Sequence, residues 1–212
     1  MFVSGSTGAG VAEYTLSTAF DVSTASHVDT LSVSAQDTFP KGHAFNSDGT
    51  KLFVVGLTGR DVNEYTLSTG FDVSTASFVD SFSVSSQESA PVGITFNTDG
   101  TKMFVIGHSG ATVDVYTLST GFDVSTASYD SSFSVSSQER YPSSVTFSND
   151  GKKMFVIGIN DDEVNEYSLS TGFDVSTASF VGYFSVSSGV PAPNCLASVS
   201  YTHLRAHETR EY

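Results

Sequence analysis

Short apolar runs alternate with turn-forming residues along most of the chain, and one stretch shows the pattern clearly. Its four runs are GITFN at 93–97, KMFVIG at 102–107, TVDVYTLS at 112–119 and YDSSFSVSS at 129–137. They are rich in β-branched and aromatic residues, which favour strands. In the last run Phe133 and Val135 alternate with serines, which is the period of a strand with one buried face. No segment has a sustained helical period, so the sequence predicts an all-β protein.

The same pattern returns every 51 residues. The heptapeptide FDVSTAS occurs unchanged at 20–26, 71–77, 122–128 and 173–179. Repeats of this length are typical of β-propellers, in which each repeat forms one blade of four antiparallel strands. We therefore predict a β-propeller over residues 1–197, with repeats at 1–51, 52–102, 103–153 and 154–197, followed by a non-repeat tail at 198–212.

Two connections within each repeat have recognisable turn chemistry. Asp-Gly pairs separate the first and second runs, and Gly49, Gly100 and Gly151 can adopt the positive φ of a tight hairpin. A calcium loop needs more oxygen ligands than these turns supply. In the FDVSTAS segments, Ser, Thr and Asp side chains can bond to nearby backbone. We expect each of these segments to be structural, with its Phe buried and its Asp capping its own turn.

Several motifs together resemble a known class of repeat. Pro-x-Gly-x-x-Phe, DGTK, MFVIG and VxVY are similar to the blades of bacterial YVTN-type and other WD40-like β-propeller proteins. The resemblance extends over residues 1–197 and implies a fold rather than an activity. The period here is longer than the YVTN unit because of the STGFDVSTAS connection. The chain also has no Trp and so lacks the Trp-Asp signature of WD40 repeats proper.

The repeat boundaries indicate an incomplete set of blades. Met1 aligns with Leu52, Met103 and Met154, so the chain begins inside a second strand. The strand sets then comprise three strands of one blade, three full blades and a lone inner strand at 194–197. This arrangement favours a section of a larger propeller. The alternative is a closed four-bladed ring, in which the last strand completes the first blade.

The tail at 198–212 differs in composition from the repeats. Its segment SYTHLRAHET resembles translated sequencing-adaptor read-through, as found in some metagenomic sequences, rather than any protein family. His203 and His207 have the i,i+4 spacing that can place two imidazoles on one metal, but the run HLRAHE lacks a third ligand. We assign no function to the tail.

Composition narrows the range of partners. The 23 Asp and Glu residues outnumber the 9 Lys and Arg residues, for a net charge of −14, which argues against nucleic acid or an anionic membrane as partner. The chain has no run of about 18 apolar residues, so we expect no membrane insertion. One cysteine, Cys195, excludes an internal disulfide. Acidic repeats rich in Ser and Thr favour an extracellular location or the surface of a cell or virion.

The loops sort onto two faces of the predicted disc. The Asp-Gly hairpins and FDVSTAS segments share one face and scarcely vary, whereas the second–third and fourth–first loops on the opposite face differ among repeats. Binding residues are usually carried on loops over a repeated scaffold. The candidate binding residues on these loops are Arg60, Asp61, His108, Arg140, Tyr141, Asp161, Asp162 and Glu163. A further candidate is His43, an inner-strand residue that departs from the repeat. The carboxylates of the acidic run 161–163 could bind a hard cation such as calcium. We expect no other cofactor.

No pattern of catalytic residues is visible. The sequence has no G-x-S-x-G elbow and no phosphate-binding glycine motif, and its histidines have no evident acid and nucleophile partners. The first hypothesis is a non-catalytic binding or display propeller of a surface, secreted or phage-associated protein, with a protein or a glycan as ligand. The alternatives are a fragment of a propeller enzyme, such as a lactonase-like hydrolase, and a purely structural repeat spacer. An enzyme would require a convergent cluster of acids and histidines at the channel mouth.

Overall fold

The protein is an all-β propeller. The structure is a computed structural model that describes residues 1–189, 193 and 195. Blade 1 comprises β1 (Phe2–Gly5), β2 (Gly10–Leu16) and β3 (Ala25–Ser32). Blade 2 comprises β4 (Pro40–Phe45), β5 (Lys51–Gly56), β6 (Asp61–Leu67) and β7 (Ala76–Ser83). Blade 3 comprises β8 (Pro91–Phe96), β9 (Lys102–Gly107), β10 (Thr112–Leu118) and β11 (Ala127–Ser134). Blade 4 comprises β12 (Pro142–Phe147), β13 (Lys153–Gly158), β14 (Glu163–Leu169) and β15 (Ala178–Ser185).

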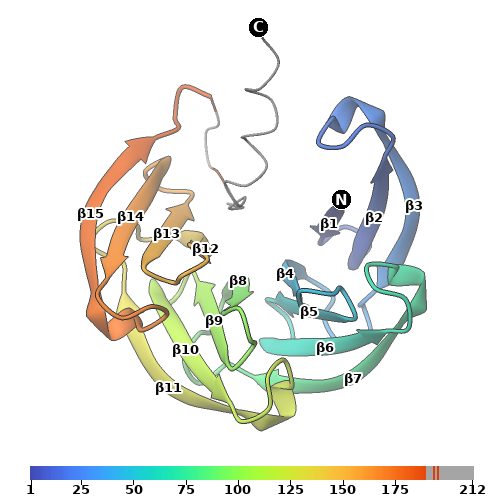
Figure 1. The fold of residues 1–212 in the computed structure, drawn as a ribbon, viewed down its shortest axis with the longest axis horizontal. Helices are drawn as coiled ribbons and strands as arrows, with labels where there is room; N and C mark the ends of the chain where they lie inside the picture. Colours follow the sequence, from blue (N-terminus) through green and yellow to red (C-terminus); the bar gives the residue numbers. More distant parts are fainter. Residues whose placement is uncertain (190–192, 194, 196–212) are drawn as a thin grey trace, which may run out of the picture.

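Each blade is an antiparallel sheet whose strands follow one another in sequence order. The blades are arranged in a ring, with β4, β8 and β12 innermost and β3, β7, β11 and β15 outermost (Figure 1). Blade 1 and blade 4 lie at the two ends of the arc that the blades form in this view. The prediction of a propeller, with three strands in its first blade and four in each of the next three, is confirmed. The larger ring of which this arc would be a section stays a prediction.

The second strand of blades 2 and 3 reads as a continuous apolar run because neighbouring blades cover both of its faces. Leu52, Phe53, Val54 and Val55 in β5 are all 0% exposed. The outermost strands are instead largely exposed, and in β11 the alternation of half-buried and exposed residues is limited to its second half, Ser131 to Ser134. This gradient from buried inner strands to half-exposed outer strands agrees with the period-2 pattern of the outer runs.

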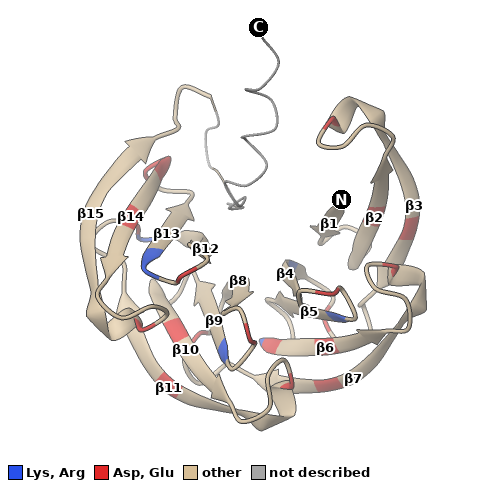
Figure 2. Ribbon diagram, viewed as in Figure 1, with Lys and Arg blue, Asp and Glu red and all other residues tan. Residues whose placement is uncertain are grey.

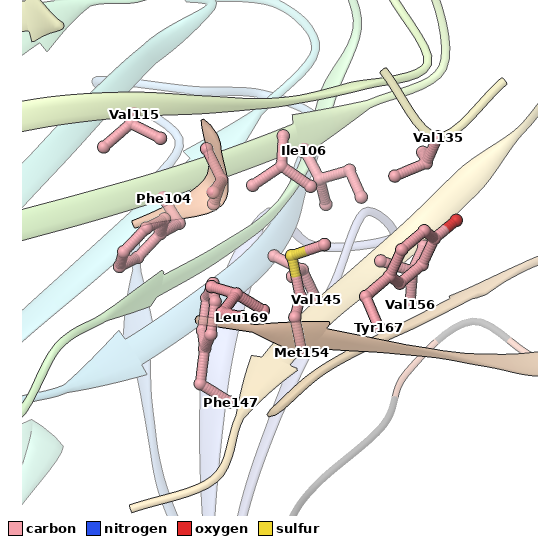
Figure 3. Close-up of a cluster of buried hydrophobic side chains, with 12 residues drawn as sticks. Phe104, Ile106, Val115, Val135, Val145, Phe147, Met154, Val156, Tyr167 and Leu169 are labelled. Atoms are coloured by element: carbon pink, nitrogen blue, oxygen red, sulfur yellow. The ribbon is translucent and has the colours of Figure 1, made fainter. Parts of the chain in front are cut away.

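The core lies between the blades rather than within one of them. Figure 3 shows the cluster between blades 3 and 4, in which Phe104 of β9 packs on Phe147 of β12 with ring centroids 4.5 Å apart. Phe133 of β11 meets Tyr167 of β14 edge-on at 5.5 Å. Each blade therefore depends on its neighbour to bury its apolar face, as expected for a stacked repeat.

The predicted hairpin turns are confirmed. Gly49, Gly100 and Gly151 have φ of 72°, 73° and 68°. Each of these three glycines also lies against the Phe ring of the FDVSTAS segment in the same blade, where a Cβ would collide with the ring. The glycines are thus required for conformation and for space.

The FDVSTAS segments form 3-10 turns, η1 (Val22–Thr24), η2 (Val73–Thr75), η3 (Val124–Thr126) and η4 (Val175–Thr177). Each Asp accepts the backbone N–H of the second residue after it, at 3.0 to 3.1 Å, as predicted. The prediction that every Phe is buried is wrong, because Phe20 is 82% exposed and Phe71 is 43% exposed. This Phe packs between its own blade and the preceding one, and Phe20 is the most exposed of the four because no described blade precedes blade 1. Phe71 packs against Phe45 of its own blade and Phe2 of blade 1 and still keeps 43% of its surface exposed.

Three remaining expectations concern the termini and the membrane. Residues 194, 196 and 197 of the expected lone inner strand, and the tail with His203 and His207, lie outside the described residues. Among the residues that are described, no helix has the length and apolar character needed to cross a lipid bilayer.

Candidate binding site at the channel mouth

The innermost strands enclose a central cavity of about 560 Å³. Its walls come from β1, β4, β8 and β12, one strand from each blade, together with Cys195. His43 lies on this wall, paired in register with Val54 of β5. Burial lowers the pKa of the His43 imidazole, so at neutral pH the ring is uncharged and its nitrogens can donate one hydrogen bond and accept another.

A second cavity, of about 290 Å³, continues from the first at the face that carries the variable loops. We call it the mouth cavity. Ser4, Lys41, Val92 and Ser143 line both cavities. The further lining residues of the mouth cavity lie where inner strands begin or second strands end, and they are Gly5, Ser6, Pro40 and His108. All four blades therefore contribute to it.

His108 is the most distinctive group in the mouth cavity. Its Nε2 is buried and has no hydrogen-bond partner, although its backbone N–H donates to the Ala90 carbonyl at 3.1 Å. Tyr141 meets the imidazole edge-on, with centroids 6.1 Å apart. Burial lowers the pKa of His108 and the nearby Lys41 charge lowers it further, against the opposing carboxylates of Glu88 and Glu139. A neutral imidazole with a buried, unsatisfied nitrogen therefore lies on the wall of the mouth cavity.

Lys41 brings a positive charge to this mouth. Its ammonium lies over the Phe39 ring, 4.7 Å from the centroid, and its backbone carbonyl accepts the Ser4 hydroxyl at 2.6 Å. Elsewhere acidic residues are spread over the strands of every blade (Figure 2). The sequence analysis did not select Lys41. Its equivalent in blade 3 is the core residue Val92, so a lysine here departs from the repeat in the same way as His43. That departure was the signal that could have identified Lys41.

The variable loops are held by buried carboxylates that the sequence reasoning also missed. Glu88 is 0% exposed and accepts the backbone N–H groups of Ala90, Ser109 and Gly110 at 2.7, 3.1 and 2.9 Å. Asp37 accepts those of Phe39 and Gly59 at 2.6 and 2.9 Å. Each carboxylate thereby ties the loop between two blades to the second–third loop of the next blade, which fixes the rim of the mouth.

Blade 4 departs from this arrangement. Glu139 accepts the Tyr141 N–H at 2.8 Å, but its other oxygen, Oε2, is buried without a partner. The position of Gly59 and Gly110 is taken there by Asp161. A Cβ at Gly110 would lie 3.2 Å from the Glu88 Oε2, so a side chain at this position crowds the carboxylate. The loop that carries Asp161 consequently does not make the bond that Gly59 and Gly110 make.

The predicted site residues fall into separate groups. His108 and Tyr141 meet at the mouth, His43 lies deeper in the channel, and Arg60 and Arg140 are exposed on their loops. Asp61 begins β6, Asp161 and Asp162 precede β14, and Glu163 begins β14. Burial, then the Asp161 and Glu139 charges, raise the pKa of Glu163. In residues 1–189, 193 and 195 no three acidic, His or Cys side chains are arranged to hold a metal ion, so calcium at 161–163 stays a prediction.

Comparison with known proteins supports the fold alone. No protein-family model and no curated protein matches the sequence. Among solved structures, a putative 6-phosphogluconolactonase from Bacteroides uniformis aligns over 83% of this chain and 51% of its own, with a TM-score of 0.56 and 14% identity. The Cps50 (Swd1) β-propeller domain of Myceliophteria thermophila aligns over 84% and 52%, with a TM-score of 0.50 and 11% identity.

A third similar structure is a chain of a nidogen/laminin complex, aligned over 92% of this chain and 63% of its own, with a TM-score of 0.59 and 12% identity. The chain therefore spans only about half to three fifths of the length of these structures. They include enzyme-like and other propellers, so the shared fold does not choose between binding and hydrolysis.

Proposed function

We propose that this propeller section is a non-catalytic module that binds a carbohydrate at the mouth cavity, within a surface, secreted or phage-associated protein. The observation that carries the proposal is the His108 Nε2, which is buried at the mouth without a partner. Buried polar atoms of folded proteins nearly always have a partner, and a ligand hydroxyl would supply one here. The Ser- and Thr-rich, acidic composition supports the extracellular setting.

The chemistry of the mouth favours a sugar over an apolar ligand. Ser6 presents a hydroxyl group, Lys41 adds a donor, and Tyr141 adds an aromatic edge beside His108. The hydroxyls of Ser4 and Ser143 donate to the carbonyls of Lys41 and Pro193, so toward a ligand they can act only as acceptors. A sugar ring needs several hydrogen-bonding groups and one apolar contact. The two cavities, of about 290 and 560 Å³, fall in the size range of small-ligand sites.

A lactonase-like hydrolase is the second candidate, favoured by the structural similarity to a putative 6-phosphogluconolactonase. Such an enzyme needs an acid or a metal close to the reacting carbonyl. The buried carboxylate beside the mouth, Glu88, already accepts three backbone N–H groups. Within the described residues no cluster of acidic, His or Cys side chains is arranged to hold a metal ion that could activate the carbonyl instead. The geometry thus supports binding better than hydrolysis.

Ligand-observed NMR with glucose, galactose and N-acetylglucosamine tests the proposal. We expect binding by at least one sugar to shift the His108 ring signals, and His108→Ala to weaken it about tenfold, the loss of one good hydrogen bond. His27→Ala is the matched control, since His27 is exposed on β3 and bonds to Thr30. Glucono-δ-lactone is assayed in parallel. Lactone hydrolysis that His108→Ala abolishes would establish the hydrolase, and a failure of every sugar to bind would overturn the carbohydrate site.

A further inference from the structure

A group of polar side chains recurs beside the second–third loop of each four-stranded blade, and we call it the loop cluster. In blade 3 it comprises Glu88, Thr112 and Asp114. A Cβ at Gly110 would lie 3.2 Å from the Glu88 Oε2 and 2.8 Å from the Thr112 hydroxyl, and that hydroxyl donates to the Asp114 Oδ1 at 3.2 Å. The equivalent residues are Asp37, Asp61 and Asn63 in blade 2, and Glu139, Glu163 and Asn165 in blade 4.

The loop clusters hold most of the buried polar atoms that the protein leaves without a partner. In the part of the chain that the structure describes, six buried side-chain nitrogen and oxygen atoms make no hydrogen bond, and five of them belong to these clusters. They are Asn63 Nδ2, Asp114 Oδ2, Glu139 Oε2, and both Oδ1 and Nδ2 of Asn165. Since buried polar atoms nearly always have a partner, we expect a small polar species to complete the clusters.

The cluster of blade 4 differs from the other two in the state of its carboxylate. In blade 3 the Glu88 Oε2 accepts the Gly110 N–H at 2.9 Å, and blade 2 has the same bond. Asp161 replaces this glycine in blade 4, and the corresponding oxygen, Glu139 Oε2, is buried without a partner. Because Glu139 is 0% exposed, bulk water does not solvate its charge.

The other groups of the blade 4 cluster are also rich in oxygen. Glu163 and Asn165 lie on the same face of β14, because side chains alternate along a strand. Burial, and then the charges of Asp161 and Glu139, raise the pKa of the Glu163 carboxyl, so these acidic groups lie within electrostatic reach of one another. Neither ion pair of the described residues involves them. Carboxylate and amide oxygens without a countercharge are the ligand set that suits a hard cation.

We propose that the blade 4 cluster binds a calcium ion through the side-chain oxygens of Glu139, Glu163 and Asn165. The Asp161 carboxylate adds a ligand from the loop. Calcium takes about six to eight oxygen ligands in a flexible geometry, so backbone carbonyls and water complete the shell. The described residues do not gather three acidic side chains round one point, so binding draws the loop that carries Asp161 toward Glu139.

The carboxylates of the other two clusters show why blade 4 is the one to bind the ion. Both oxygens of Glu88 in blade 3 and of Asp37 in blade 2 already accept backbone N–H groups. In blade 4 the ion takes the place of the N–H that Glu139 lacks. It thereby ties the loop between blades 3 and 4 to the second–third loop of blade 4. This site is independent of the carbohydrate proposed for the mouth cavity.

Calorimetric titration of the full chain with calcium chloride tests the proposal, together with thermal unfolding in calcium and in EGTA. We expect one ion per chain with a Kd of roughly 0.1–1 mM, the range of extracellular calcium modules. At roughly 10 mM calcium the unfolding midpoint should rise by about 3 °C. Magnesium chloride at the same concentration is the control for charge screening, because the chain has a net charge of −14. It should raise the midpoint by less than about 1 °C, since magnesium sheds its water reluctantly.

Two variants locate the site by opposite effects. Glu139→Gln keeps the shape of the side chain but removes its charge, and should weaken calcium binding at least about tenfold. Asp161→Gly restores the glycine of blades 2 and 3, so Glu139 Oε2 regains a backbone N–H. In EGTA this variant should therefore unfold about 2–4 °C above the unsubstituted protein, and calcium should no longer raise its midpoint. Asp130→Asn, exposed on β11, is the matched control and should respond to calcium like the unsubstituted protein.

The outcomes divide clearly. Loss of the calcium response in both variants, with the gain of Asp161→Gly in EGTA, establishes the site. The proposal is overturned if calcium up to roughly 10 mM gives neither binding heat nor a midpoint shift. It is also overturned by a magnesium response equal to that of calcium, or by a calcium response that both Glu139→Gln and Asp161→Gly retain. Sugar binding is measured in EGTA, so either proposal can fail without the other.

Discussion

At the scale of single residues, the buried carboxylates show how a polar group can organise loops that carry function. Glu88 is 0% exposed, and its two oxygens accept the backbone N–H groups of three loop residues. The contribution of such a carboxylate to folding stability depends on how many buried donors it satisfies. Each donor that is left without a partner has lost its hydration as well as its hydrogen bond.

This reasoning predicts unequal costs for two equivalent glutamates. Glu88→Ala leaves three N–H groups unpaired and should lower the free energy of unfolding by about 2–4 kcal/mol. Glu139→Ala removes one bond, to Tyr141 N–H, together with an oxygen that had no partner, and should cost about half as much. Urea unfolding of both variants measures the difference. Equal losses would contradict the assignment of Glu88 as the organiser of its loop.

Asp114 gives a pH-dependent prediction. It lies 3% exposed in β10, and burial, with the Glu88 charge as a further contribution, raises the pKa of its carboxyl to about 6 although the Thr112 hydroxyl opposes the shift. Because the folded protein holds this proton more tightly than the unfolded chain, Asp114 favours folding below pH 4 and this contribution is lost as the pH rises through 6. Asn occupies the equivalent positions 63 and 165, so Asp114→Asn suits the blade.

Asp114→Asn should therefore stabilise the protein at pH 7 by up to about 3 kcal/mol and have little effect at pH 4. Urea unfolding of the variant and of the unsubstituted protein from pH 4 to 7.5 measures the difference. Asp130→Asn is the control, since Asp130 is exposed on β11 and should leave stability unchanged at either pH. A stabilisation that is equal at pH 4 and pH 7 would show that the proton has no part in it.

At the scale of elements, the FDVSTAS segment is a brace between blades. Its Asp caps the 3-10 turn, its Val N–H and Phe carbonyl reach the preceding blade, and its Phe has a positive φ of 58° to 63°. That left-handed backbone is unusual for an aromatic residue. It is fixed by a bond from the Phe N–H to the hairpin Gly carbonyl, at 3.0 Å for Phe122 and Gly100.

Gly100→Ala tests the fit between the hairpin and this brace. A Cβ at residue 100 would collide with the Phe122 ring, and φ of 73° is unfavourable for alanine. We expect a loss of about 2–4 kcal/mol, because the collision adds to the backbone strain. Gly182→Ala on β15 is the matched control: it has open space around it and should change stability by less than about 0.5 kcal/mol. Equal effects of the two substitutions on thermal unfolding would contradict the fit.

The elements could be predicted from the sequence because they depend on local chemistry. The strand runs, the glycine turns and the Asp caps follow from residue type and spacing. The exposure of each Phe did not follow, because it depends on how closely the ring packs between two blades, and Phe71 stays 43% exposed although blade 1 precedes it. The meeting of Lys41, His108 and Tyr141 also could not be predicted: these residues come from three blades, and only the curvature of the ring brings them to one mouth. The departure of His43 from the repeat was visible, but the cavity it lines was not.

At the scale of the whole molecule, stability is expected to vary along the arc. Blades 2 and 3 have neighbours on both sides, whereas each end blade has one within the chain. In a stacked repeat, stability is approximately a sum of blade and junction terms, so the loss of one junction weakens the end blade more than the distant ones.

Hydrogen exchange resolved by strand tests this gradient. β5 and β9 should exchange most slowly, because their central residues are 0% exposed. β1 should exchange at least about tenfold faster, since no described blade covers it on one side and its Val3 is 47% exposed. Uniform exchange across the four blades would instead show that the arc unfolds as one cooperative unit, and that the contacts between neighbouring blades do not set its local stability.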